Sequence, residues 1–314
     1  MSDRIVSKIR FVNLHGHSVA GSMFDGLGYP QEHMEFAYSN GADALALTDH
    51  GNMNGLAWQV LHAKKMQAEG KSFKPIYGVE AYFVPSVAEW REEYERALKD
   101  KKKSRSAKKG DTSGATIEDE NQSKKASKNI LNRRRHLVLL AQNQRGLNNL
   151  FKLVSESYKS ENFYRYPRID YSMLEKYSEG VVAASACLGG VYAGCLWENG
   201  VYDQEGSMTG YDEESLIIDM RQVTEKMLSI FGDRWFGELQ WNNIPEQHTL
   251  NKYIIQMHQE YNIPLISTAD SHYPNPDAWK DRELYRRLGW LGKGRPSWAE
   301  DGELPISVEE IGYE

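Results

Sequence analysis

Histidines and acids stand directly after short apolar runs at several places in this chain. His15 and His17 follow the run at residues 9–14, and residues two apart in an extended segment point to the same side. Two imidazoles that leave the end of a strand together can bind one cation. The H-x-H pair alone is a weak signal, because two surface histidines give the same pattern.

Three other places repeat this arrangement of a metal-binding side chain and an apolar run. They are His50 after residues 44–47, Glu80 within residues 75–82, and Asp270 with His272 after residues 264–268. A buried carboxylate is costly unless it is paired. Since the carboxyl ends of parallel strands meet at one edge of a sheet, we expect these distant side chains to lie together.

Imidazole and carboxylate ligands together suit zinc, manganese or iron better than magnesium or calcium. Such ions lower the pKa of a bound water and offset the charge on phosphate oxygens. A histidine must be neutral to coordinate a metal, so activity is expected to fall in acid. The pattern predicts a metal-binding site at the ends of the strands.

The elements that position these residues alternate between short β-branched runs and longer amphipathic segments. The expected strands are residues 9–14, 44–47, 75–82, 137–141, 180–184, 235–240 and 264–268. The expected helices include residues 32–39, 56–68, 146–157, 216–229 and 245–260. This alternation predicts an α/β fold with a largely parallel sheet, either open or closed into a barrel.

Composition limits the partners and the compartment. The 314 residues carry 38 basic and 44 acidic side chains, and this net charge of −6 gives no global attraction for nucleic acid. Local basic clusters or bound cations would have to supply it. Two cysteines make no disulfide framework, the N-terminus lacks an apolar signal core, and no run is long enough to cross a bilayer. We expect a cytoplasmic protein.

Residues 99–128 are rich in Lys, Ser, Gly and Asp and almost free of apolar side chains. Such a segment cannot bury enough surface to offset its ordering entropy, so we expect a disordered basic insertion. It could contact DNA as a basic arm, or it could have no role. The sequence favours neither.

Six segments resemble one known family. LHGHSVAGSMFDG, ALALTDHGNMNGLAW and KPIYGVEAYFVP are similar to the opening motifs of the polymerase-and-histidinol-phosphatase (PHP) domain of bacterial and phage DNA polymerase III alpha subunits. RHLVLLAQNQRGLNNLFKLVS, YPRIDYSMLEKYSEGVVAASACLGG and PLISTADSHY continue the resemblance in order. It implies a distorted (β/α)7-type barrel over residues 1–290. Residues 291–314 would then start a link to a polymerase core, which this chain lacks.

The resemblance also implies nine metal ligands and three divalent ions, zinc or manganese, with iron as another choice. The ligands, which would act in catalysis through the bound metals, are His15, His17, Asp25, His50, Glu80, His136, Cys187, Asp270 and His272. His136 begins its apolar run, so only the resemblance places it in the site. Because every position holds a competent ligand, an active enzyme is favoured over a silent relative.

The activity that the resemblance implies is 3′–5′ exonuclease action on DNA during replication, on a single strand or a primer 3′ end. A polymerase core or other replication subunits would be partners. One alternative is a small-molecule phosphatase of the histidinol-phosphate kind. Another is a catalytically silent, metal-stabilised module that supports a polymerase.

Three residues outside the ligand set have open roles. Arg168 could bind a substrate phosphate or form a salt bridge within the fold. Asp49 could orient a histidine or be an ordinary acid at a strand end. Cys195 is expected to be a small buried side chain.

Overall fold

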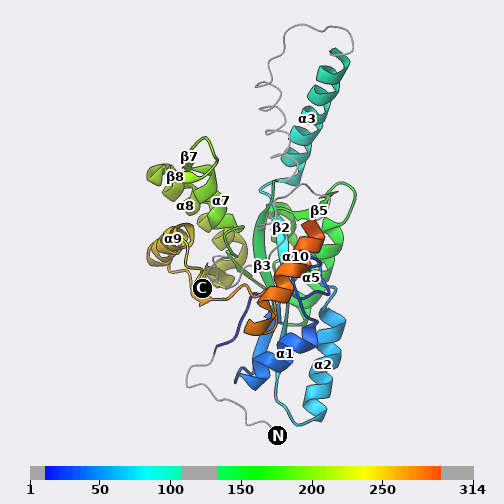
Figure 1. The fold of residues 1–314 in the computed structure, drawn as a ribbon. Helices are drawn as coiled ribbons and strands as arrows, with labels where there is room; N and C mark the ends of the chain where they lie inside the picture. The colour runs from blue at the N-terminus through cyan, green and yellow to red at the C-terminus, as the bar shows by residue number, and fades with distance from the viewer. Residues whose placement is uncertain (1–10, 108–132, 291–314) are drawn as a thin grey trace.

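The computed structural model describes residues 11–107 and 133–290 and places an eight-stranded, curled sheet at the centre of the molecule (Figure 1). Its strands follow the order β10-β9-β6-β3-β2-β5-β4, and β1 also pairs with β2. Their bounds are β1 (Ala44–Leu47), β2 (Lys74–Phe83), β3 (Arg135–Ala141), β4 (Phe163–Tyr164), β5 (Tyr166–Ile169), β6 (Val181–Ala184), β9 (Trp235–Leu239) and β10 (Leu265–Ser267).

Residues 13–17 connect the two sides of this curl. On one side, Ala46 N of β1 donates a hydrogen bond to Asn13 O at 2.9 Å. On the other, His17 N donates to Ser271 O at 2.8 Å, just beyond β10. The sheet therefore curls into a distorted barrel. The expected first strand is wrong for residues 11–14, which make too few ladder hydrogen bonds to count as a strand. The isolated bridge of this segment lies just after them, at Gly16. Residues 9 and 10 lie outside the described part.

The expectation of a largely parallel sheet holds for β1 with β2 and for β6, β9 and β10. It is wrong for β3, which runs antiparallel to both β2 and β6. The helix after β2, α3 (Val87–Ala107), extends away from the sheet instead of packing back along it (Figure 1). Since β3 starts at the edge where β2 ends, it has to run in the opposite direction.

Helices surround the sheet, and a small hairpin lies outside it. Their bounds are α1 (Pro30–Ser39), α2 (Leu56–Ala68), α5 (Gln144–Ser157), α6 (Tyr171–Tyr177), α7 (Val191–Glu198), α8 (Glu213–Phe231), α9 (Pro245–Tyr261) and α10 (Trp279–Trp290), with hairpin strands β7 (Gly200–Tyr202) and β8 (Met208–Tyr211). Three helices, α5, α6 and α8, begin with a side-chain cap. Asn143, Asp170 and Asp212 each accept a hydrogen bond from a backbone N–H of the first turn. No helix in the described ranges is both long and apolar enough to cross a membrane.

The expected disordered insertion at residues 99–128 needs a correction at its start. Residues 99–107 belong to α3, where lysine, arginine and alanine are good helix formers. Residues 108–128 lie outside the described part of the chain.

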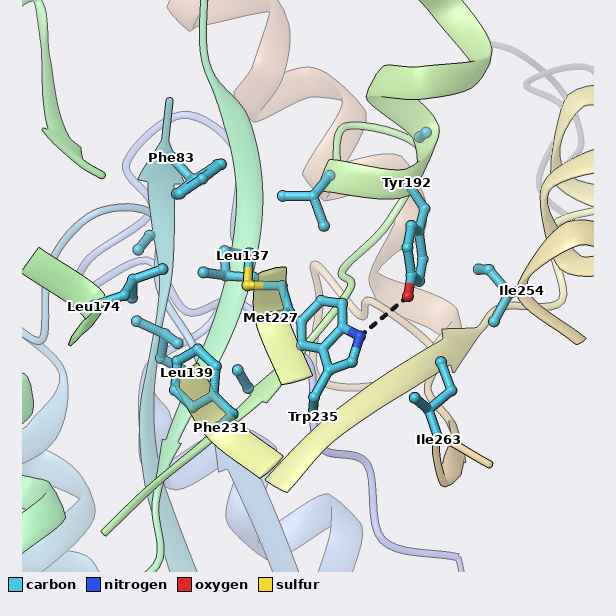
Figure 2. Packing of buried hydrophobic residues seen from close by; sticks show 14 of the residues in the cluster. Phe83, Leu137, Leu139, Leu174, Tyr192, Met227, Phe231, Trp235, Ile254 and Ile263 are labelled. Carbon is cyan, nitrogen blue, oxygen red and sulfur yellow. Dashed lines mark hydrogen bonds between the residues drawn. The ribbon is translucent and has the colours of Figure 1, made fainter. Parts of the chain in front are cut away.

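The main core lies between the sheet and the helices from α5 to α9. Figure 2 shows Trp235 of β9 at its centre, with its indole N–H donating to Tyr192 OH at 3.0 Å. Leu137 of β3 and Met227 of α8 are fully buried in the same cluster. Close packing leaves little freedom to such strands, so the side chains at their ends are held in fixed positions.

Candidate metal centre

Glu80 lies at the centre of the site and is fully buried near the end of β2. Its Oε1 is 3.1 Å from His15 Nε2 and 3.0 Å from His136 Nδ1. Its Oε2 is 2.5 Å from His50 Nδ1 and 3.6 Å from His17 Nε2. One carboxylate thus faces four imidazoles from three separate segments, as a ligand that bridges neighbouring ions would.

His15 and His17 leave the same segment and reach the same acid. Asp270 Oδ1 is 3.3 Å from His15 Nε2 and 3.0 Å from His17 Nε2. Asp270 has φ 46°, a left-handed conformation that aspartate tolerates better than most residues. The H-x-H and D-x-H motifs therefore meet, as the strand-end argument predicts.

Asp25, His50 and His272 form the more exposed part of the cluster. Asp25 Oδ2 is 3.1 Å from His50 Nε2 and 3.6 Å from His272 Nε2. These three side chains are 38%, 15% and 18% exposed, whereas His15 and Glu80 are fully buried. A substrate would therefore approach over the Asp25 side.

His136 enters from β3 because that strand is antiparallel. The start of β3 lies at the edge where β2 and β6 end, so His136 reaches the cluster from the beginning of its strand. Cys187, after β6, has its Sγ 3.6 Å from His136 Nδ1 and 3.7 Å from Glu80 Oε1. Gly189 N donates to this sulfur at 3.4 Å. All nine candidate ligands thus gather in one cluster.

Burial and mutual contacts shift the protonation of these groups. Burial, with the His50 and His272 rings, lowers the pKa of His17 to about 3. Burial would also lower the pKa of His50, but the Glu80 and Asp25 carboxylates outweigh it and raise that pKa to about 10. Burial would raise the pKa of Glu80, but the surrounding imidazoles hold it well below its usual range. The centre of the cluster is an anion that divalent cations would neutralise in place of protons.

The donor atoms fit metal ions. His15 Nε2, His50 Nδ1 and Glu80 Oε2 are buried and make no hydrogen bond within the described residues, although they lie close together. Buried polar atoms without such partners are rare. Three overlapping sets have ligand atoms within 4.8 Å of one another: His17, His50 and His272; His15, His17 and Glu80; and His50, Glu80 and His136. The arrangement can hold metal ions.

Comparison with known proteins agrees with this geometry. The profile of the PHP domain matches residues 13–242, which is most of the chain. The chain belongs to the PHP domain family. It is 36% identical over 268 residues to DNA polymerase III subunit alpha of Aquifex aeolicus, covering 85% of this chain and 18% of that protein. With the same subunit of Borreliella burgdorferi the identity is 32% over 302 residues, covering 96% and 21%.

This PHP domain chain therefore spans about a fifth of the length of these curated relatives. Among solved structures, an amidohydrolase from Chromobacterium violaceum, with bound sulfate and no metal, is 13% identical with a TM-score of 0.41, covering 87% of this chain and 96% of that chain. A proposed metal-dependent phosphoesterase from Bifidobacterium adolescentis is 17% identical with a TM-score of 0.37, covering 85% and 90%.

Two residues that the sequence analysis missed contact candidate ligands of this PHP domain. Glu238, in β9, lies 2.6 Å from His15 Nδ1 and is almost fully buried. Arg282, in α10, donates to Asp25 Oδ1 at 2.9 Å and to Asp25 O at 3.1 Å. Glu238 lies within an expected strand, as Glu80 does, which is a signal that could have found it. Arg282 stands among many charges in its helix and gives no such signal.

Arg168 is not at the substrate side of the PHP domain, so the expectation of a phosphate contact is wrong. Its side chain is fully buried, and it donates to the backbone oxygens of Arg133, Tyr164 and Tyr166 at 2.9–3.1 Å. The guanidinium also lies 3.9 Å from the centre of the Trp90 ring. Arg168 therefore connects β5 to β4 and to the segment before β3.

Asp49 does orient a histidine of this PHP domain, through a serine. Ser22 Oγ donates to Asp49 Oδ1 at 2.9 Å and lies 3.2 Å from His17 Nδ1. The other four histidines bond elsewhere: His33 to Leu27 O, His62 to Glu35, His248 to Asn243 and His258 to Ile263 O. Cys195 is buried in the core, as expected.

Proposed function

We propose that this PHP domain is a metal-dependent phosphodiesterase that releases nucleotides from the 3′ end of single-stranded DNA. The observation that carries the proposal is the set of three overlapping ligand groups, two of which contain Glu80. We assign one divalent ion to each group, zinc or manganese, with iron as another choice. Divalent ions bound there would act as Lewis acids toward the oxygens of a phosphate ester.

The buried and the exposed candidate ligands would have different roles. His15 and Glu80, at the bottom, have no solvent exposure and would hold their ions away from bulk water. Asp25 and His272, at the open side, would face the arriving ester. Glu238 holds the His15 ring, and Glu80 lies in a packed strand. The free energy needed to reorganise these side chains when a substrate binds is therefore small.

The choice of DNA as substrate is supported by the relatives, which are DNA polymerase III alpha subunits. We infer that the domain works beside a polymerase core or other replication subunits. We also take the functional unit to extend past the matched residues to α10, because Arg282 of that helix binds Asp25.

The test is metal-dependent release of nucleotides from a single-stranded oligonucleotide after EDTA treatment and return of Mn²⁺ or Zn²⁺. His15→Ala and Asp270→Asn should abolish release. His248→Ala is the matched control, since the ring of this histidine contacts Asn243, outside the cluster. Release by neither metal would reject the exonuclease proposal. Faster hydrolysis of histidinol phosphate than of DNA would favour the small-molecule phosphatase instead.

A further inference from the structure

Phe24 and Arg134 stand next to two different parts of the candidate metal cluster. Phe24 directly precedes Asp25, which contacts His50 through the ring's Nε2. Arg134 stands two residues before His136, which reaches the Nδ1 side of His50 through Glu80. Phe24 and Arg134 are therefore neighbours, in the chain, of residues that reach different nitrogens of the His50 ring.

The Phe24 ring is fixed at the open side of the cluster. Its φ is 63°, a conformation that is rare for an aromatic residue and is often found at functional sites. Its ring stacks on Tyr285 of α10, with centroids 5.3 Å apart and planes at 29°, yet 41% of the residue is exposed. A side chain at Gly289 would come within 2.5 Å of Phe24, so α10 is shaped to accept the ring. One aromatic surface is thus held in place and exposed to solvent.

The Arg134 guanidinium is held by two tyrosine rings. It lies 3.8 Å from the centre of the Tyr166 ring and 5.1 Å from that of Tyr82. The Tyr82 ring in turn lies 5.5 Å from the His136 ring and 6.0 Å from the His50 ring, parallel to the latter within 13°. A cation is therefore positioned one aromatic ring away from the candidate ligands.

We propose that these two side chains bind a single-stranded nucleic acid across the metal cluster, an inference that rests on the proposed function. An unpaired base stacks on Phe24, since every base has a π face, and the backbone phosphate next to the cleaved one binds Arg134. The chain has a net charge of −6, so a local cation such as Arg134 is needed to attract the backbone. The site then selects strands over single nucleotides, which cannot reach both side chains.

The test is binding of a fluorescent oligothymidylate, made resistant to cleavage by phosphorothioate linkages, measured by anisotropy at several salt concentrations. Phe24→Ala should weaken binding about 10-fold, whereas Phe24→Trp, which keeps a ring, should not. Arg134→Gln should weaken it by a similar factor and make the dependence of log Kd on log salt shallower by about 0.7. Phe24→Ala should leave that salt dependence unchanged.

Two matched controls come from the same chain. Phe163 is also 41% exposed and stacks on Tyr158 at 5.6 Å, outside the metal cluster. Arg145 lies in the first turn of α5, after the opposite end of β3 from His136, and pairs with Glu179. Phe163→Ala and Arg145→Gln should bind the oligonucleotide like the wild type.

The inference is overturned if Phe24→Ala and Arg134→Gln bind as tightly as these controls, or if the wild-type protein does not bind the oligonucleotide. Hydrolysis of bis(p-nitrophenyl) phosphate by the wild type tests the proposed function separately, because this small diester does not need both contacts. Its absence would reject the phosphodiesterase, whereas hydrolysis without strand binding would reject only the contacts assigned to Phe24 and Arg134.

Discussion

Glu238 Oε1 lies 2.6 Å from His15 Nδ1 at the bottom of the candidate metal cluster, and both side chains are almost fully buried. Thr268 Oγ1 donates to the same oxygen at 2.6 Å, and Gln240 Nε2 donates to it at 3.1 Å. A carboxylate that holds the far nitrogen of an imidazole fixes the orientation of the ring and leaves the other nitrogen for a metal. In His15 that other nitrogen is Nε2, which faces Glu80 and Asp270.

The first prediction concerns this carboxylate. Glu238→Gln should lower the affinity for Zn²⁺ or Mn²⁺ by about 10-fold to 100-fold, because the amide is a weaker partner for the imidazole N–H. Calorimetric titration of metal into the apoprotein measures the change. Glu214→Gln, at an exposed position in the first turn of α8, is the control. An unchanged affinity in Glu238→Gln would show that His15 does not depend on this contact.

A second prediction concerns α10, which lies outside the matched PHP residues. Arg282 binds the carboxylate and the backbone oxygen of Asp25, and its Nη1 donates to the buried Glu283 at 2.8 Å. Lysine keeps the charge but cannot form this fork. Arg282→Lys should therefore lose metal affinity by roughly 10-fold, the lower end for residues that hold a ligand in place.

The measurement is again metal titration, with the melting temperature recorded in EDTA to separate folding from binding. Arg221→Lys is the control, since Arg221 forms a similar fork with Glu260 on the surface. If Arg282→Lys and Arg221→Lys bind metal equally well, α10 contributes nothing to the site.

Local sequence pattern sufficed for some of these features and not for others. It gave the limits of β1 and α2 correctly, because a short apolar run marks the strand and a longer run of mainly good helix formers marks the helix. It could not place His136, because the direction of β3 depends on where α3 leaves the sheet. It could not identify Arg282 either, because this residue contacts Asp25 only when α10 docks onto the Asp25 loop, and the two residues are 257 positions apart.

Metal removal should destabilise the fold as well as stop hydrolysis. Ions that bind only the native state add about 2.7 kcal/mol of stability at a concentration 100 times Kd, so EDTA should lower the melting temperature by several degrees. In His15→Ala the difference between metal and EDTA should shrink, because one ligand set is incomplete. Scanning calorimetry of both proteins with and without Mn²⁺ provides the comparison. Equal melting temperatures with metal and EDTA in the wild type would contradict metal binding at the cluster.

The last prediction is a pH dependence from His33, which is buried in α1 and lies 2.8 Å from Leu27 O through Nε2. Burial lowers the pKa of His33 to about 4 from an ordinary value near 6.5. As the pH falls, the unfolded chain therefore binds the proton before the native protein does. The stability that depends on neutral His33 is fully present above about pH 6.5 and is lost as the pH falls toward 4.

Between pH 7 and pH 5 the free energy of unfolding should fall by about 2 kcal/mol more in the wild type than in His33→Gln. Glutamine can still donate to Leu27 O but takes up no proton. Urea unfolding at both pH values measures this, with EDTA present so that metal release does not contribute. The other titrating groups are common to both proteins and cancel in the difference. Parallel losses of stability in the two proteins would mean that His33 has the same pKa in the native and unfolded states, and would contradict the prediction.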